Sequence, residues 1–179
     1  MDNNHYWGRE LLGVLALEEP ELDLLIHQAA RLKNTSPRWR CDMVREVVLA
    51  VIPRHAARPD KFFEKEREAF LQEVQQRNTL GCAVKHKFGL DEHFHVLYFL
   101  LAKLAGAGQH LRLCAKMIEP GLQYSWVEIV GDFEVLHGGR SEKHDLRIID
   151  FTREFFSDHE NPYRIDQRRY EDGETVAGF

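Results

Sequence analysis

The stretch HFHVLYFLLAKLA, residues 93–105, decides the fold, because it is nearly continuous in apolar residues. A run of this length with apolar residues on most sides is typical of a helix that is buried on most sides. Asp91 is placed to cap the start of this helix, and the glycines of Gly106-Ala107-Gly108 are placed to end it. The sequence therefore predicts a central buried helix between Asp91 and Ala105.

The sequence before this run predicts further helices. From about Tyr6, apolar residues recur at spacings of three and four, as on one face of a helix, and Pro20 divides two such segments. The segment Asn34-Thr35-Ser36-Pro37 offers a capping residue followed by proline at the first helical position, and Pro53 stops the helix that follows. A third helix is expected to begin near Asp60.

After the central helix, the hydrophobic pattern changes to that of short strands. Four runs are rich in β-branched and aromatic residues, and turn-forming pairs separate them at 120–121, 131–132 and 138–139. The connections are too short for crossover helices, so we expect antiparallel neighbours. The predicted strands are Leu111 to Ile118, Tyr124 to Val130, Asp132 to Leu136 and Leu146 to Thr152.

We therefore predict an α+β fold with N-terminal helices, a buried central helix and a small antiparallel sheet. One domain is expected over residues 1–156, with a helical part at 5–78 and a helix-plus-sheet core at 81–156. Residues 157–179 are expected to form a polar C-terminal tail without regular structure. The chain has 179 residues, of which 44% are hydrophobic, and this is enough to form a core and excludes disorder as the main state.

Charge and composition narrow the class of partner. The 24 basic and 29 acidic residues give a net charge of -5, which argues against a nucleic-acid partner, because phosphate backbones are bound by clustered Lys and Arg. The apolar runs are far shorter than the roughly 20 residues of a membrane span, and Met1 to His5 lacks a basic signal region. A cytoplasmic location without a membrane partner is expected.

Cysteine and glycine usage exclude some site types. Cys41, Cys82 and Cys114 include no CxxC pair, which argues against a disulfide framework and favours a reducing compartment. The Gly106-x-Gly108 pair lacks the remaining residues of a phosphate-binding loop, so no nucleotide cofactor is expected. We predict no cofactor for this chain.

Three segments between residues 81 and 156 resemble the transglutaminase-like and papain-like cysteine enzymes. Tyr124-Ser125-Trp126-Val127-Glu128-Ile129 resembles the strand in which a catalytic His precedes a small residue, Trp, Val and Glu. Leu146-Arg147-Ile148-Ile149-Asp150-Phe151-Thr152 resembles the strand that ends in the catalytic Asp, and Gly89-Leu90-Asp91-Glu92-His93-Phe94 resembles the nucleophile turn. The resemblance implies an acyltransferase or amide hydrolase acting on a protein or peptide.

In this register, two catalytic positions carry other residues. Asp91 stands at the nucleophile position, where it cannot form a thioester, and Tyr124 stands at the base position with an ordinary pKa near 10. Only Asp150 is retained. A triad needs an imidazole to take the thiol proton, so this register implies a pseudoenzyme, an inactive scaffold whose N-terminal helices and acidic surface bind a protein partner.

A second register retains a thiol. Cys82 follows a glycine, as in the family, and a cysteine at a helix N-terminus has its thiolate stabilised. His86, four residues on, would share its helix face. This register predicts a catalytic set of Cys82, His86 and Asp150, in which Asp150 orients a histidine base. His137 and His144 are alternative bases in the same register.

A zinc site is a third interpretation. Cys82, His86, His93 and His95 lie within fourteen residues, and zinc selects sulfur and imidazole donors. On a helix, Cys82 and His86 share a face, whereas His93 and His95 point about 200° apart and cannot bind one ion. The alternative metal set is therefore Cys82, His86 and His93. Without a metal, one of the three histidines is expected to be buried and two solvated.

Overall fold

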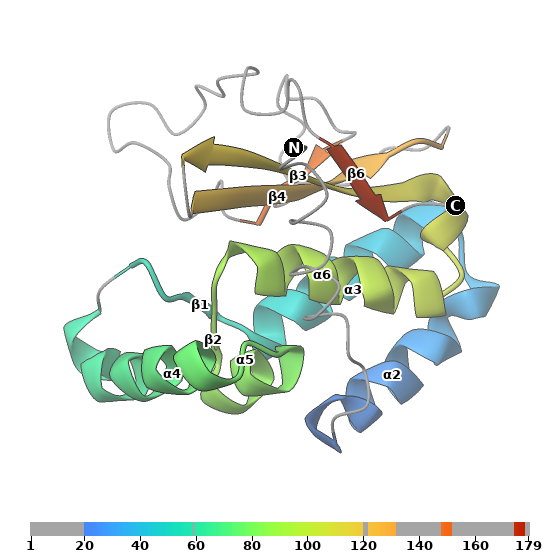
Figure 1. The fold of residues 1–179 in the computed structure, drawn as a ribbon. Helices are drawn as coiled ribbons and strands as arrows, with labels where there is room; N and C mark the ends of the chain where they lie inside the picture. Colours follow the sequence, from blue (N-terminus) through green and yellow to red (C-terminus); the bar gives the residue numbers. More distant parts are fainter. Residues whose placement is uncertain (1–19, 59, 120–121, 132–147, 152–173, 178–179) are drawn as a thin grey trace.

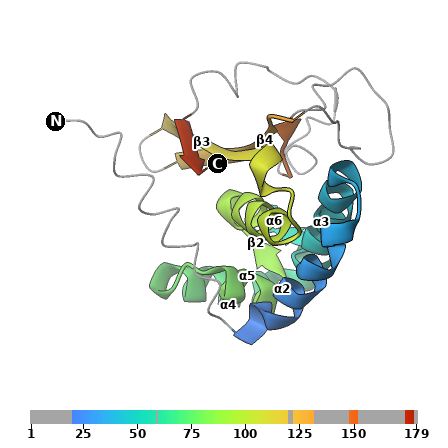
Figure 2. The same ribbon diagram turned by 90° about the vertical axis from the view of Figure 1, so that its right-hand side faces the viewer.

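The computed structural model describes residues 20–58, 60–119, 122–131, 148–151 and 174–177. Within these ranges the fold is α+β, and a central helix, α6 (Asp91–Leu104), lies between two layers. A small sheet lies on one side of α6. Helices α2 (Asp23–Ala30), α4 (Glu64–Gln76) and α5 (Leu80–His86) lie on the opposite side, and α3 (Pro37–Val51) lies alongside α6 (Figures 1 and 2). This arrangement confirms the mixed helix-and-sheet class that the sequence predicts.

Two helices begin where the sequence predicts them, after the segment that ends in Ser36-Pro37 and near Asp60. Ser36 accepts a hydrogen bond from the Trp39 N–H at 3.3 Å with Pro37 as the first helical residue, and Asp60 accepts one from the Phe62 N–H at 2.9 Å. Between residue 20 and α6, the structure describes the helices η2 (Pro20–Leu22), α2, η3 (Arg31–Asn34), α3, η4 (Lys61–Phe63), α4 and α5. A short helix, η5 (Gly108–His110), follows α6. The helical segment predicted before Pro20 lies outside the described residues.

Helix α6 is buried as predicted, but its capping differs. Nine of its fourteen residues are buried, because the helical layer covers one side and the sheet the other. Leu90 is the N-cap residue, and its N–H donates to His93 Nδ1 at 3.0 Å. Asp91 does not cap the helix as expected, because its carboxylate turns toward the sheet and accepts two hydrogen bonds there.

Among the described residues, the sheet has four strands in the order β5-β4-β3-β6, and all neighbours are antiparallel. Its strands are β3 (Leu111–Glu119), β4 (Leu122–Ile129), β5 (Ile148–Ile149) and β6 (Glu174–Ala177). The strands predicted from Leu111, from Tyr124 and around Ile148 are thus present, and the one predicted from Asp132 lies outside the described residues. One face of the sheet packs against α6 through Leu113, Val127 and Ile149.

Two pairings were not predicted. Strand β6 comes from the segment expected to be an irregular tail, and it adds to the edge of β3, with Cys114 opposite Thr175. The tail prediction is therefore wrong at residues 174–177, because a strand this short gains its hydrogen bonds only from a distant partner. The second is a parallel pair between β1 (Arg54–His55) and β2 (Phe88–Gly89), joined through α4 and α5.

Strand β2 passes so close to the core at Gly89 that a larger residue there should destabilise the fold. A Cβ at this position would lie 2.8 Å from Phe94 Cε2 and 2.9 Å from Ile52 Cγ2, inside van der Waals contact. We expect Gly89→Ala to lower the free energy of unfolding by about 1–3 kcal/mol, as overpacking of a buried site does. Urea denaturation measures this change, and a transition midpoint equal to that of the parent chain would contradict it.

Candidate functional site

The structure brings Asp91, Tyr124 and Asp150, the three positions of the first register, to one buried junction between α6, β4 and the end of β5. Asp91 Oδ2 accepts hydrogen bonds from the Ser125 backbone N–H at 2.5 Å and from the Ser125 hydroxyl at 2.9 Å. The Tyr124 hydroxyl donates to Asp150 Oδ2. We refer to these residues, together with His95, as the α6 junction.

His95 completes the α6 junction from the next turn of the helix. Its Nε2 accepts from the Phe151 N–H at 2.9 Å, and its Nδ1 lies 3.0 Å from Ser125 Oγ. Because the Ser125 hydroxyl donates to Asp91, its oxygen accepts from Nδ1–H, and this pattern corresponds to a neutral ring protonated at Nδ1. Ser125 and His95 are fully buried, so the network fixes α6 against the sheet and presents no nucleophile at the surface.

Burial and charge shift the pKa values of the α6 junction. Burial raises the pKa of Asp91 to about 6. The Asp150 carboxylate also raises this pKa, whereas His95 and the hydrogen bonds from Ser125 lower it. Burial alone would lower the pKa of His95, but Asp91 and Asp150 outweigh it and raise the pKa. A protonated Nε2 would lose the Phe151 hydrogen bond and face Asp150 Oδ1 at 3.6 Å.

Asp91, His95 and Asp150 have donor atoms within 4.8 Å of one another, but an ion bound to His95 Nε2 would have to displace the Phe151 N–H. The Phe151 N–H points at His95 Nε2, and its positive hydrogen would lie where a cation has to sit. Asp91 Oδ2 is held by Ser125, and Asp150 Oδ2 by Tyr124. These atoms serve as hydrogen-bond acceptors within the protein.

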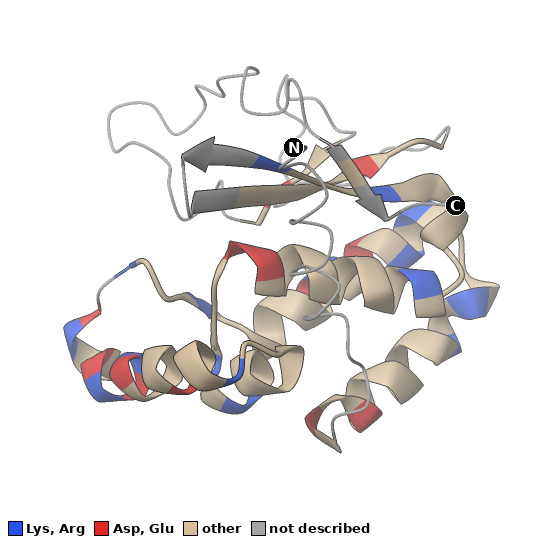
Figure 3. Ribbon diagram, in the orientation of Figure 1, with Lys and Arg blue, Asp and Glu red and all other residues tan. Residues whose placement is uncertain are grey.

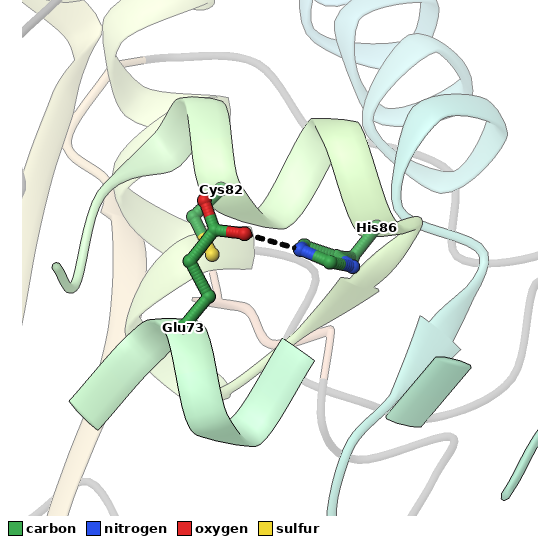
Figure 4. A group of neighbouring side chains, drawn as sticks. All are labelled: Glu73, Cys82 and His86. Carbon is green, nitrogen blue, oxygen red and sulfur yellow. Dashed lines mark hydrogen bonds and ion pairs between the residues drawn. The ribbon is translucent and has the colours of Figure 1, made fainter. Parts of the chain in front are cut away.

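A second group joins Glu73 on α4 to Cys82 and His86 on α5 (Figure 4). His86 Nε2 lies 2.7 Å from Glu73 Oε2, and one ligand atom of each of the three residues lies within 4.8 Å of the others. The structure thus brings Cys82 and His86 together as predicted from their spacing. Asp150, the third member of the predicted catalytic set, lies in the α6 junction instead, and Glu73 is the carboxylate beside His86.

Local structure places Cys82 and His86 on one face of α5. Thr79 Oγ1 accepts from the Cys82 N–H at 3.2 Å and caps the helix, and Lys87, in the left-handed conformation at φ 59°, ends it. Cys82 is 3% exposed, whereas the His86 and Glu73 side chains are 16% and 31% exposed. The group is therefore open to solvent from its histidine and carboxylate side.

Glu73 is the member that sequence reasoning missed. Hydrogen bonds from His86 and from Lys85 Nζ at 2.7 Å lower the pKa of Glu73 to about 2, so its carboxylate is ionised. Glu73 lies three residues after the buried Phe70, which places it near the inward face of α4. This spacing was the available signal, but α4 carries several other acidic residues that look equivalent in sequence.

The remaining histidines differ from expectation. His93 does not join Cys82 and His86: it is buried in α6, where its Nδ1 accepts from the Leu90 N–H and its ring packs against Phe70. His93 and His95 are both fully buried, so the expectation of one buried and two solvated histidines is wrong; α6 is covered on both sides. His137 and His144 lie outside the described residues.

A surface pocket of about 470 Å³ is lined by β1, the segment that follows it, η4 and β2. Phe62 stands at this pocket with 90% of its surface exposed, and the Arg54 guanidinium lies 3.5 Å from the centre of the Phe63 ring. Figure 3 shows Lys and Arg along the segment that leads from β1 to α4. The lining residues are Pro53, Arg54, His55, Arg58, Asp60, Lys61, Phe62 and Phe88, and we call them the basic pocket.

No family model, curated protein or solved structure matches this chain. The function is therefore inferred from the geometry of the two side-chain groups and of the basic pocket. In the part of the chain that the structure describes, no helix is both long and apolar enough to cross a lipid bilayer.

The raised pKa of Asp91 predicts a pH dependence of stability. Between the ordinary value of 3.8 and the folded value of about 6, the folded chain holds a proton that the unfolded chain has released. The contribution of Asp91 to stability is therefore fully present below pH 3.8 and declines as the pH rises to about 6. We expect the parent chain to lose stability relative to Asp91→Asn over this interval, measured by urea denaturation at several pH values.

Glu92→Gln is the matched control for this prediction. Glu92 precedes His93 on the same turn of α6, and its carboxylate binds Asn78 outside the α6 junction. Like Asp91→Asn, this variant replaces one carboxylate of α6 by an amide, so it measures what the loss of a negative charge from the helix does by itself. Parallel curves for the parent chain and Asp91→Asn would show that Asp91 does not hold the extra proton.

Proposed function

We propose that this chain is a transglutaminase-like scaffold without the chemistry of that family, and that it acts as a protein-binding module. The observation that carries the proposal is the α6 junction. The resemblance aligns Asp91, Tyr124 and Asp150 with the nucleophile, the base and the orienting acid. All three side chains are hydrogen-bonded within the protein, where they have a structural role.

The chemistry of these side chains supports the inactive assignment. A carboxylate at residue 91 cannot form a thioester, and a tyrosine hydroxyl that donates to Asp150 does not act as the base that a triad requires. Ser125 could replace the thiol only if its proton passed to His95, yet its hydroxyl donates to Asp91. The family positions thus stabilise the fold and leave binding to other parts of the surface.

The basic pocket is the surface that we assign to the partner. Arg54, Arg58 and Lys61 line it on a chain whose net charge is -5, and Asp60, the acidic residue among them, uses its carboxylate to cap η4. The exposed Phe62 ring adds apolar area beside this charge. Charge complementarity therefore favours an acidic segment of a protein partner with at least one apolar side chain to cover Phe62.

A peptide segment fits this pocket better than a nucleic acid does. Nucleic acids are bound along their backbone by many cations, and affinity grows with the number of phosphates contacted. Three cations in one pocket, on a chain with an excess of acidic residues, provide little of that attraction. An acidic peptide needs only a few charge contacts together with apolar burial.

Peptide selection tests this assignment. We expect a phage-displayed random peptide library, selected on the full chain, to yield peptides that combine Asp or Glu with an apolar residue. The double variant Lys61→Glu, Phe62→Ala should bind them at least roughly tenfold more weakly, a loss of about 1.4 kcal/mol. Because both side chains are exposed, their replacement should leave the unfolding transition unchanged.

Lys33→Glu is the matched control, since it reverses an equally exposed charge on η3, outside the pocket. It should retain the affinity of the parent chain for the selected peptides. Peptides without acidic residues, or peptides whose affinity the double variant leaves unchanged, would contradict the assignment. Tight binding of a single-stranded DNA oligonucleotide that depends on Lys61 would assign the pocket to nucleic acid instead.

Acyl transfer or amide hydrolysis through Cys82 is a second candidate, favoured by one observation. The Cys82 sulfur and a His86 nitrogen lie within 4.8 Å, and Glu73 contacts the same ring. Catalysis would require the thiol, which is 3% exposed, to open to a substrate and the imidazole to release Glu73. The candidate therefore depends on whether Cys82 reacts in the folded chain.

Alkylation by iodoacetamide at a series of pH values tests this second candidate. Burial raises the pKa of Cys41 to about 11 and that of Cys114 to about 12, so these two thiols serve as unreactive internal references. A catalytic Cys82 would be alkylated first, with a rate that reaches its plateau well below the pH of about 8.5 at which a free thiol ionises. Peptide mass spectrometry resolves the three sites, and a Cys82 as inert as Cys41 would exclude this candidate.

A further inference from the structure

We propose that Glu73, Cys82 and His86 form a three-ligand zinc site whose fourth position is open to solvent. This inference concerns a different surface from the basic pocket and does not depend on the proposed partner. It follows from the way in which a sulfur, a nitrogen and an oxygen donor from two helices converge on one point (Figure 4).

The ring orientation of His86 separates metal binding from a catalytic relay. In a thiol–imidazole–carboxylate relay, one ring nitrogen faces the thiol and the other faces the carboxylate. Figure 4 shows the Nε2 edge of His86 turned toward both Glu73 and Cys82, with the second nitrogen on the far side of the ring. In a relay, the thiol and the carboxylate would compete for this one nitrogen. A metal ion bound to the nitrogen can instead bind the sulfur and the carboxylate oxygen at the same time.

The donor set and its dimensions suit zinc. Zinc binds cysteine sulfur at about 2.3 Å and histidine nitrogen or carboxylate oxygen at about 2.0–2.2 Å, so its tetrahedral ligands stand roughly 3.3–3.7 Å apart. The three donor atoms lie within 4.8 Å of one another, and the separation between Nε2 and Oε2 is 2.7 Å. Binding requires this hydrogen bond to open by less than about 1 Å and the sulfur to approach by a similar amount.

Helix geometry and exposure make that adjustment feasible. Cys82 and His86 are one turn apart on α5, which fixes two ligands on a rigid element. Glu73, on α4, has a long side chain that is 31% exposed, so it can rotate without disturbing the core. An ion reaches the group from its solvent side, and on binding the Cys82 thiol releases its proton to water and the His86 proton moves from Nε2 to Nδ1.

Lys85 provides a feature that distinguishes a metal site from a surface ion pair. Its ammonium lies 2.7 Å from Glu73 Oε2, the oxygen that also binds His86. A zinc ion bound to Glu73 would compete with this ammonium for the carboxylate. Removing Lys85 should therefore strengthen zinc binding, while it would weaken any role that consists only of ion pairing.

Zinc and cobalt titrations of the full, reduced chain test the site. We expect one equivalent of Zn²⁺ to bind in competition with a chromophoric chelator. Co²⁺ should give the intense near-ultraviolet band of thiolate coordination together with the visible bands of a tetrahedral ion. Cys82→Ser, His86→Gln and Glu73→Gln should each weaken binding by at least roughly tenfold, and Cys82→Ser should abolish the thiolate band. Lys85→Met should bind Zn²⁺ more tightly than the parent chain.

Cys114→Ser and His27→Gln are the matched controls, because both residues lie outside the group. Circular dichroism of each variant confirms folding; Glu73→Gln and Lys85→Met keep the test decisive if the Cys82 variant unfolds, because both side chains are partly exposed. Absence of stoichiometric binding, or binding that Glu73→Gln and Lys85→Met leave unchanged, would overturn the proposal. Either result is independent of peptide binding at the basic pocket.

Discussion

Burial of α6 between the sheet and the helical layer is the constraint on which the rest of the structure depends. The helix brings Asp91, His93 and His95 into the interior, and buried polar groups must find their partners within the protein. Ser125 supplies two hydrogen bonds to Asp91, Leu90 supplies one to His93, and Phe151 supplies one to His95. The sheet and the helix therefore cannot separate without leaving a charged or polar group unsatisfied.

The same network fixes the register of the sheet against the helix. Ser125 faces α6 while its neighbours on β4 face the other side of the sheet, so a slip of one residue would carry the hydroxyl away from Asp91. Tyr124 binds Asp150 at the end of β5 and so ties the edge strand to β4. Asp91, Tyr124 and Asp150 thus link β4 both to α6 and to the edge strand β5.

Local features of the structure could be predicted from the sequence, whereas long-range partners could not. Ser36 and Asp60 cap helices within three residues of themselves, and their signals are complete in a short segment. The partners of His95 lie 30 and 56 residues away, and Glu73 reaches His86 across 13. Periodicity shows which residues share a helix face, but not which face of another element lies opposite. For the same reason, β6 was missed, since its strand character comes from pairing with β3.

The two side-chain groups contain similar residues but have different roles, one structural and one in ion binding, because their surroundings differ. In the α6 junction, a backbone N–H points at the imidazole, and Asp91 and Asp150 each accept protein donors through Oδ2. In the Glu73, Cys82 and His86 group, a single imidazole nitrogen faces both a thiol and an ionised carboxylate, and solvent reaches it from one side. Sulfur, nitrogen and oxygen atoms that converge on one point from rigid helices are better placed to bind one metal ion together than to pass a proton along a relay. Coordination geometry, more than the presence of a cysteine and a histidine, therefore decides which chemistry this surface supports.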